Sequence, residues 1–506
     1  MRLGFKAFCL LLSTAGISNA ATLARWVQYA PGDLHAANAP ASLTNTILVR
    51  AVVTDVSSCP TALLDHDTAL TMQPRFAAGD VPAFVQAGSG AFADGTPHAT
   101  ENWGACEAIV PPGHRTVTVD GADLKLPVPN PRRILVIGDT GCRLREDADT
   151  AGVPQDCDGP AAFPFKYLAE FEATLQPDVI VHVGDWTHRE KPCAPGAAGC
   201  VDGAPWGDTF DAWNADLFAP AKTLLAAAPW IMLRGHDEAC GRGARGWFAL
   251  LDSWPFDAAK ARCTRTQVYP PVRGEAATYT AEFEPSYVVP LGGALMIVHD
   301  SSRAEDGAAD LDLAENYDVD LTALLNRLRD SAPGKPAIFA THTPTFDRSH
   351  AAQAASCDVG HAAAGDESAQ DGAAIFGGNL TLQAVFSGAA GHMTTAFYDG
   401  VPPGISLFLS GHVRQFRYLN VGTGDSVNVQ FAPQLIVGAA GSLLHADCSY
   451  DPAHARTESV FGNDAFGFAL LTATGNGYTA EIYKASAGRA GECAVSFKSR
   501  AVRCRF

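Results

Sequence analysis

Ile180-Val-His-Val-Gly-Asp-Trp-Thr-His-Arg-Glu190 is the stretch around which the chain is organised. Its apolar start predicts a short buried strand over 179–183 that stops at Gly184-Asp185. Glycine permits a sharp turn there, and a carboxylate at the carboxyl end of such a strand lies where α/β sheets bind their ligands. His188 follows three residues after Asp185 and can reach the same point. For one Gly-Asp pair alone an ordinary turn is the simpler interpretation, so the argument depends on repetition.

The same pattern, an apolar run that ends in Asp or His, returns in other segments. These runs end at Gly138-Asp139, Gly235-His236-Asp237, His299-Asp300, His342 and Gly411-His412. Amphipathic helices are predicted between the runs, over 165–175, 206–228 and 321–328. Alternating strands and helices predict an α/β layered core. Residues 351–398, rich in Ala and Gly, are predicted to form a long surface excursion.

Length and composition predict a large domain with smaller parts on either side. With 506 residues, 47% hydrophobic and 18% charged, the chain is typical of globular proteins and too long for one small domain. We predict a β-rich N-terminal domain over 22–130, a central domain over 131–447 and a β-rich C-terminal extension over 448–506 that packs on the core. The formal net charge of −18 argues against a nucleic-acid partner, because phosphate backbones bind basic surfaces.

Residues 1–20 have the features of a cleavable secretory signal peptide. Arg2 and Lys6 give a basic start, 7–17 form a short apolar region, and Ser18-Asn19-Ala20 supplies small residues for cleavage. We therefore expect a secreted or periplasmic protein, and no other stretch is predicted to span a membrane.

The cysteines agree with export. Of the 13 cysteines, Cys9 lies in the signal peptide, so 13 − 1 = 12 remain, and an even number in an exported protein predicts disulfides. Pairs between sequence neighbours are plausible, although connectivity does not follow from sequence: Cys59 with Cys106, Cys142 with Cys157, Cys193 with Cys200, and Cys240 with Cys263.

Six strand-end residues are candidates to converge on one crevice: Asp139, Asp185, His188, His236, His342 and His412. A single histidine at a strand end is more often structural, but six such residues in separate segments predict a metal site. Mixed carboxylate and imidazole ligands suit Zn²⁺, Mn²⁺, Fe or Ni²⁺. Two such ions can clamp a phosphoryl group and stabilise both the attacking and the leaving oxygen.

The ordered series resembles the calcineurin-like metallophosphoesterases, and within them the branch of purple acid phosphatases and their bacterial relatives. That branch typically shows Gly-Asp-x-Gly, Gly-Asp-x-x-Tyr, Gly-Asn-His-Glu/Asp, a lone His and Gly-His-x-His. The matching pieces lie within about 133–445. The resemblance implies a four-layer α/β/β/α sandwich preceded by a small β-rich domain, with 131–447 as the catalytic domain. It also implies two transition-metal ions, Zn, Mn or Fe, and a small phosphorylated substrate.

The resemblance implies a role for each of the six residues. Asp139 would bind the first metal, Asp185 would bridge, and His188 would complete the first site. The second metal would be bound by His236, His342 and His412. A metal-bound hydroxide would attack the phosphorus of a phosphate mono- or diester, and Asp237 could assist protonation of the leaving group.

Two positions depart clearly from the family pattern. His188 stands where the branch has a ligating tyrosine, and Arg414 replaces the last histidine of Gly-His-x-His. Imidazole can ligate, whereas arginine stays protonated and cannot. Arg414 could instead contact a phosphate oxygen, as could Arg143, Arg189 or Arg234.

The segment Gly235-His236-Asp237-Glu238 allows two alignments. The ungapped match sets His236 against a ligand asparagine and Asp237 against a substrate-facing histidine, and it also fits Glu238. A shifted match keeps His236 as the catalytic histidine. His299 and Asp300 are candidates to orient metal ligands, although an ordinary strand-end turn is an equal interpretation.

Two other functional classes stay open at this point. A scaffold that kept the fold but lost turnover would also show altered positions, and would act as a binding or structural protein outside the cytoplasm. A metal-dependent hydrolase of another bond is the third possibility. A serine hydrolase is disfavoured because no Gly-x-Ser-x-Gly motif occurs. Oligomeric state is not predicted.

Overall fold

The computed structural model describes residues 21–32, 45–76, 80, 103–144, 154–192, 204–264, 277–305, 309–346, 379–387, 404–419, 432–444, 458–461, 465–486 and 488–505. The predicted signal peptide over 1–20 lies outside these residues, as do Cys193 and Cys200. Within the described residues, no helix combines the length and apolar character needed to cross a membrane.

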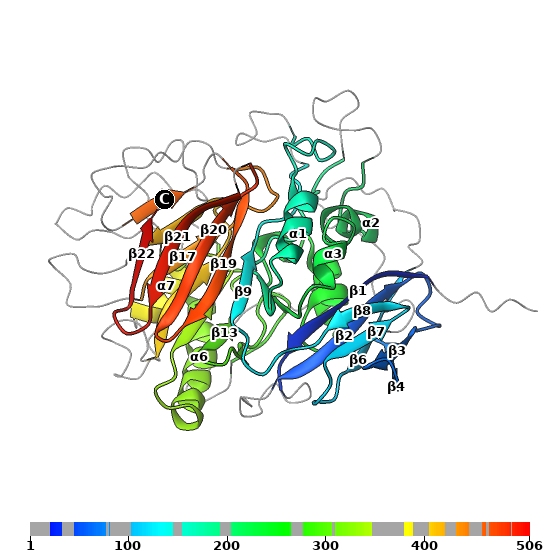
Figure 1. The fold of residues 1–506 in the computed structure, drawn as a ribbon, viewed down its shortest axis with the longest axis horizontal. Coiled ribbons are helices and arrows are strands. Elements are labelled where there is room, and N and C mark those ends of the chain that lie inside the picture. Colours follow the sequence, from blue (N-terminus) through cyan, green and yellow to red (C-terminus); the bar gives the residue numbers. More distant parts are fainter. Residues whose placement is uncertain are drawn as a thin grey trace, which may run out of the picture.

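A large mixed sheet of 11 strands runs through the molecule (Figure 1). Its strands are, in spatial order, β22 (Ala501–Arg505), β21 (Gly488–Ser496), β20 (Gly477–Lys484), β19 (Gly467–Thr474), β9 (Arg133–Ile137), β10 (Val179–His182), β11 (Trp230–Met232), β1 (Thr22–Ala30), β2 (Thr46–Val53), β6 (Gly104–Ile109) and β5 (Gln73–Pro74). The central strands β9, β10, β11 and β1 are parallel to their neighbours within this group, whereas both wings are antiparallel.

A second sheet of seven strands carries the other half of the core. Its order is β12 (Tyr287–Pro290), β13 (Leu295–Val298), β14 (Ala337–Ala340), β15 (Ile405–Ser410), β17 (Gln434–Val437), β16 (Phe416–Leu419) and β18 (Glu458–Phe461). The four strands β13, β14, β15 and β17 are parallel. A small third sheet consists of β4 (Thr68–Thr71), β3 (Thr61–Leu64), β7 (Thr116–Val119) and β8 (Ala122–Lys125).

Apolar packing joins the two large sheets face to face. One buried cluster contains Val136 and Val181 of the first sheet together with Met296, Ile338 and Leu407 of the second. These strands are apolar on both faces because each sheet is also covered on its other side. The short apolar runs that end in Asp or His therefore predict strands well, and they form β9, β10, β11, β13, β14 and β15.

Helices cover the remaining faces. On the first sheet lie α1 (Phe165–Thr174), α2 (Phe210–Trp213) and α3 (Lys222–Leu225), and the short helices α4 (Ala244–Gly246) and α5 (Ala258–Ala261) follow. The helix predicted over 206–228 is interrupted by a π-helical turn at Asn214–Phe218. On the second sheet lie α6 (Leu311–Ser331), capped by Asp310, and α7 (Leu380–Ser387).

Helix α7 corrects the prediction of a surface excursion over 351–398. Leu382 and Val385 are fully buried beside α6 in the second cluster of core residues. This helix was not predicted because the residues on either side of it are rich in Ala and Gly, a composition typical of loops. The rest of that stretch lies outside the described residues.

The N-terminal and C-terminal regions both contribute strands to the large sheet. Gln28 of β1 pairs in parallel with Trp230 of β11, and β19 pairs antiparallel with β9. The α/β class and a β-rich N-terminal region are thus confirmed, and the sheet is continuous across residue 130. The division into domains stays a prediction.

Four disulfides lie within the described residues. Three are the predicted pairs Cys59–Cys106, Cys142–Cys157 and Cys240–Cys263. The fourth joins Cys493 and Cys504, which face each other across β21 and β22.

Candidate metal centre

The strand ends of both sheets bring the predicted residues together. Asp139 follows β9 and Asp185 follows β10 in the first sheet, while His342 follows β14 and His412 follows β15 in the second. The carboxyl ends of parallel strands meet at one edge, which is why these side chains converge. Three of the four have left-handed backbones: Asp139 with φ 55°, Asp185 with φ 58° and His412 with φ 74°. Such conformations are rare outside glycine and occur often at functional sites.

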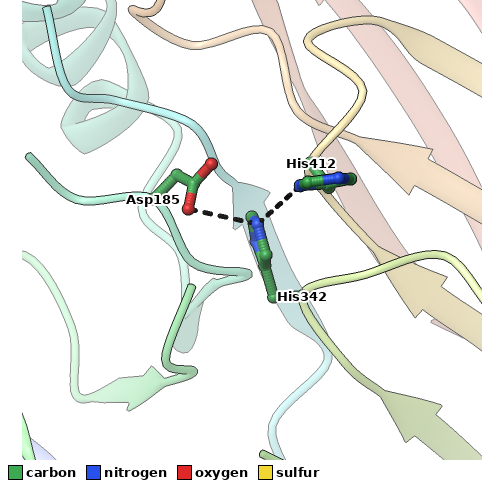
Figure 2. Close-up of side chains that lie close together, drawn as sticks. All are labelled: Asp185, His342 and His412. Atoms are coloured by element: carbon green, nitrogen blue, oxygen red, sulfur yellow. Dashed lines mark hydrogen bonds and ion pairs between the residues drawn. The ribbon is translucent and has the colours of Figure 1, made fainter. Parts of the chain in front are cut away.

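Asp185, His342 and His412 form a tight group, which we call the first ligand group (Figure 2). One ligand atom from each lies within 4.8 Å of the other two. Nε2 of His342 lies 3.1 Å from Oδ1 of Asp185 and 3.1 Å from Nδ1 of His412. Asp185 and His342 are buried, and His412 is half-buried.

The first ligand group has the chemistry of a cation site. Nδ1 of His342 lies 2.7 Å from the carbonyl oxygen of Val183, which can only accept, so Nδ1 carries the proton. In the neutral imidazole, Nε2 then points a lone pair at the Asp185 carboxylate, and two acceptors face each other. Either a second proton on His342 or a metal ion between these atoms removes the conflict. A backbone carbonyl behind a ligating histidine is also the usual support at metal sites.

Asp139 lies beside this group. Its Oδ2 accepts a hydrogen bond of 2.9 Å from the backbone N–H of His412, whereas its buried Oδ1 has no hydrogen-bond partner among the described residues. Burial and the nearby charge of Asp185 raise the pKa of Asp139 to about 8. Burial would also raise the pKa of Asp185, but the imidazoles of His342, His236 and His412 hold it well below its usual range. A buried oxygen without a hydrogen-bond partner next to these ligands is consistent with a metal site, in which Asp139 would be a further ligand of the ion.

Two glycines make room for the carboxylates. Gly184 has φ 100°, and a Cβ there would lie 2.5 Å from Nδ1 of His342. A Cβ on Gly438, just after β17, would lie 2.6 Å from Oδ2 of Asp139. Side chains at these positions would push the carboxylate or imidazole out of place.

A second cluster, which we call the second ligand group, contains His188, Glu190 and Asp237. All three are buried, and their ligand atoms also lie within 4.8 Å of one another. Nδ1 of His188 lies 3.1 Å from Oδ2 of Asp237, and Nε2 lies 3.8 Å from Oε1 of Glu190. The guanidinium of Arg242 contacts both carboxylates through its Nη2.

The backbone couples the two groups. The N–H of Asp237 donates to Oδ1 of Asp185 at 2.9 Å, so the carboxylate of the first group holds the loop that carries the second. Nδ1 of His188 also lies 3.2 Å from Oγ of Ser442, whose N–H donates to the carbonyl oxygen of Asp139. Burial and the carboxylates of Asp185 and Glu238 raise the pKa of Asp237 well above its usual range.

His236 and Arg414 occupy more open positions. The rings of His236 and His412 have centroids 6.0 Å apart, and His236 is half-buried. Arg414, with φ 50°, is also half-buried, and its Nε is enclosed without a hydrogen-bond partner among the described residues. The structure therefore brings His236 to the first ligand group and His188 to the second.

Three supporting residues escaped the sequence analysis. The carboxylate of Glu238 accepts hydrogen bonds from the N–H groups of Asp185 at 3.2 Å, Trp186 at 2.9 Å and Gly235 at 3.0 Å. Oγ of Ser301 accepts from the N–H of His342 at 3.1 Å. The rings of His182 and Trp186 stack with their centroids 3.5 Å apart, and Nε2 of His182 is hydrogen-bonded to Oγ1 of Thr140 at 2.9 Å. Glu238 stood within a recognised motif, but nothing in the sequence signalled Ser301 or His182.

Four other suggestions from the sequence find structural roles instead. Nε of Arg189 donates to the buried Asp216 at 2.6 Å. Arg234 is buried, donates to the carbonyl oxygens of Glu238 and Ala281, and lies 3.4 Å from Asp300. Nδ1 of His299 pairs with Ser286 at 2.8 Å, inside an aromatic cluster. Asp300 itself lies beside Arg234, and it is the neighbouring Ser301 that accepts a hydrogen bond from the backbone N–H of His342.

Comparison with protein families agrees with this geometry. The model of the calcineurin-like phosphoesterases matches residues 132–388. The chain belongs to the calcineurin-like phosphoesterase family. The matched region includes both loops after β9 and β10, the segment 235–238, and His342; His412 and Arg414 lie beyond it.

Similar solved structures were found, whereas no curated protein matches the chain. The structure of PhoD aligns with a TM-score of 0.50 at 11% identity, over 97% of this chain and 93% of that chain. A dimetal phosphatase from Danio rerio aligns with a TM-score of 0.38 at 11% identity, over 72% of this chain and 99% of that chain. GAP50, the anchor in the inner membrane complex of Plasmodium, gives 0.35 at 12% identity, over 71% and 86%. The PhoD likeness supports the metallophosphoesterase fold along nearly the whole chain.

Proposed function

We propose that this protein is a metal-dependent phosphoesterase that hydrolyses small phosphate mono- or diesters. The observation that carries the proposal is the first ligand group, in which Nε2 of His342 faces the Asp185 carboxylate at 3.1 Å in a chain of the phosphoesterase family. The two facing sheets with helices outside them support a four-layer α/β/β/α sandwich as its framework. The site would lie where the two sheets meet.

The first ligand group would hold the ion, with Asp139 beside it. A transition ion bound there polarises a phosphoryl oxygen and lowers the pKa of water. The Asp185 carboxylate, whose pKa is held well below its usual range by the surrounding imidazoles, keeps a negative charge in the site, and this charge favours a cation. Val183 and Glu238 fix the orientation of His342 and of the Asp185 turn, respectively.

We assign the proton for the leaving group to His236 in preference to Asp237. Asp237 is buried, and its two oxygens contact Arg242 and His188. His236 is half-buried beside His412, where substrate can reach it, and an imidazole is the side chain that most often serves as a general acid. Arg414 is the residue we propose for contact with a phosphate oxygen, because its enclosed Nε lacks a partner in the described part of the chain.

Two ions per chain remain part of the proposal, one in each ligand group, although Arg242 already contacts the second group. We also propose that the protein is exported, which four disulfides support. The predicted division at residues 130 and 447 stays with this proposal.

Hydrolysis by chelator-stripped and metal-restored protein tests the function. We expect no turnover of 4-nitrophenyl phosphate or bis(4-nitrophenyl) phosphate after stripping, and recovery with Zn²⁺, Mn²⁺ or Fe²⁺. The Asp185→Asn variant should not recover, whereas Asp330→Asn, a change at an exposed site on α6, should behave as wild type. The proposal would be refuted if the stripped protein, or Asp185→Asn supplied with metal, hydrolysed these esters as fast as the metal-restored wild type.

A scaffold without turnover is the second candidate. The observation that favours it is the guanidinium of Arg242 among potential metal ligands. One bound ion per chain with no hydrolysis of any phosphoester offered would decide for the scaffold.

A further inference from the structure

The second ligand group has a feature that the phosphoesterase resemblance does not explain. His188 stands at the position of the family's ligating tyrosine. It lies between the carboxylates of Glu190 and Asp237, and Arg242 contacts both of them. Glu190 closes the stretch 180–190 but received no role from the sequence, and Arg242 belongs to no motif that the sequence showed.

We propose that His188, Glu190 and Asp237 form a cation-exchange site in which Arg242 and a divalent transition ion are alternative occupants. The guanidinium neutralises the carboxylates when the second ion is absent. A Zn²⁺ or Mn²⁺ ion takes its place when the metal concentration is high enough, and the guanidinium then turns toward solvent. The proposal rests on the proposed function only in taking the first ligand group as the site of the tighter ion.

The surroundings of the His188 imidazole favour a bound cation. If Nδ1 of His188 carries the proton, its Nε2 lone pair faces Glu190 at 3.8 Å. If Nε2 carries it, the Nδ1 lone pair faces Asp237 at 3.1 Å, with the hydroxyl of Ser442 at 3.2 Å beside it. Either neutral form therefore leaves a lone pair beside a carboxylate oxygen, and an ion bound to all three groups satisfies them together. Imidazole and two carboxylates are a ligand set that Zn²⁺ and Mn²⁺ accept.

Charge and burial explain why Arg242 contacts these two carboxylates. The side chains of Glu190 and Asp237 are 2% and 3% exposed, and burying two carboxylates without a cation is costly. Arg143 also interacts favourably with the charge of Asp237. Adding a divalent ion while Arg242 stays would leave excess positive charge, so the ion and the guanidinium compete.

Arg242 is placed to leave without moving the backbone. Its side chain is 17% exposed, so it enters the group from the solvent side. The backbone on either side is held, because Gly243 donates to the carbonyl oxygen of Asp237 at 2.8 Å and Cys240 is bonded to Cys263. Rotation of one side chain is therefore sufficient for exchange. A released guanidinium at the edge of the site would be available to a phosphate oxygen.

The test counts Mn²⁺ ions on the chelator-stripped full chain, using the electron paramagnetic resonance signal of free Mn²⁺. We expect wild type to bind one ion tightly and a second more weakly. Arg242→Gln should bind the second ion on the order of tenfold more tightly. Arg262→Gln, which changes an arginine bonded to the carbonyl oxygen of Asp80, should match wild type.

The double variant Arg242→Gln/Glu190→Gln separates ligand loss from charge loss. It should lose the tightened second ion and keep the first. An unchanged second dissociation constant in Arg242→Gln, or a gain that persists in the double variant, would overturn the exchange site. If Arg242→Gln does not fold, Arg242→Lys replaces it, because lysine lacks the planar fork of the guanidinium; its second ion should then also bind more tightly than in wild type.

The same titration distinguishes failure of this inference from failure of the proposed function. His342→Ala should remove the tight ion. If it does, and the dissociation constant of the second ion is the same in wild type and in Arg242→Gln, only the exchange site is wrong. If wild type binds no ion at all, the proposed function and the exchange site fail together, and turnover by the restored enzyme will be absent as well.

Discussion

The first ligand group surrounds a carboxylate with imidazoles, whereas the second surrounds an imidazole with carboxylates. Asp185 lies among His342, His412 and the nearby His236, and its pKa is held well below the usual range. In the second group the pKa of Asp237 is raised well above the usual range by burial and by nearby carboxylates. The two clusters consist of similar residue types and are joined by a hydrogen bond from the backbone N–H of Asp237 to the Asp185 carboxylate, yet they have opposite electrostatic character.

The difference follows from how each group is built. The first group comes from the ends of parallel strands in two sheets, so rigid neighbours fix its geometry. The second comes from the loops after β10 and β11, where His188, Glu190, Asp237 and Arg242 depend on one another for position. A site on strand ends is ready for a metal ion before the ion arrives. A site on loops needs an internal cation to hold its charges together.

Replacing one histidine from each group is the strongest way to test this comparison. We expect His342→Ala to lower kcat/KM for a phosphoester on the order of 1,000-fold or more, because the ion it would bind supplies several kcal/mol to the transition state. His188→Ala should lower it only about ten- to a hundredfold. The measurement is steady-state kinetics with metal content determined on the same samples. Equal losses in both variants would mean that the groups share one indispensable site.

The sequence predicted the first group because its signals are local. A buried strand shows as a run of apolar residues, and the polar residue after it must lie at the edge of the sheet. Asp139, Asp185, His342 and His412 could therefore be identified from one sequence. The strands β9, β10, β13, β14 and β15 were found by the same reasoning, and β10 ends at His182, one residue before the predicted end.

His188 and Asp237 were predicted as site residues, but their grouping with Glu190 and Arg242 could not be predicted, because these contacts are set by loop conformation. The contact between Arg242 and Glu190 spans 52 residues, and neither residue stands at a strand end. Strand β1 was also missed, since its position between β11 and β2 is a long-range pairing with no local signal. Ser301 supports His342 through a serine oxygen that any strand-end loop could carry. Tertiary structure decides all three features.

Gly438→Ala sharpens the comparison by asking whether Asp139 belongs to the first group. The new Cβ would lie 2.6 Å from Oδ2 of Asp139, so the carboxylate has to move. We expect a loss of about 2 kcal/mol in the free energy of unfolding from overpacking. Affinity for the tight ion should fall with it, while the second ion should not respond. Gly475→Ala is the control, because a Cβ there meets nothing within 4 Å.

Ser301→Ala is the mildest test, because it touches the first group only through its support. Oγ of Ser301 accepts from the N–H groups of His342 at 3.1 Å and Thr343 at 3.0 Å, and alanine leaves both buried donors without that acceptor. We expect a loss of about 1 kcal/mol of stability and a decrease in affinity for the tight ion of roughly tenfold. Ser331→Ala, at the exposed end of α6, should change neither quantity. Because Ser301 bonds to the loop that carries His342, an equal change in the affinity of the second ion would show that the two groups respond as one unit.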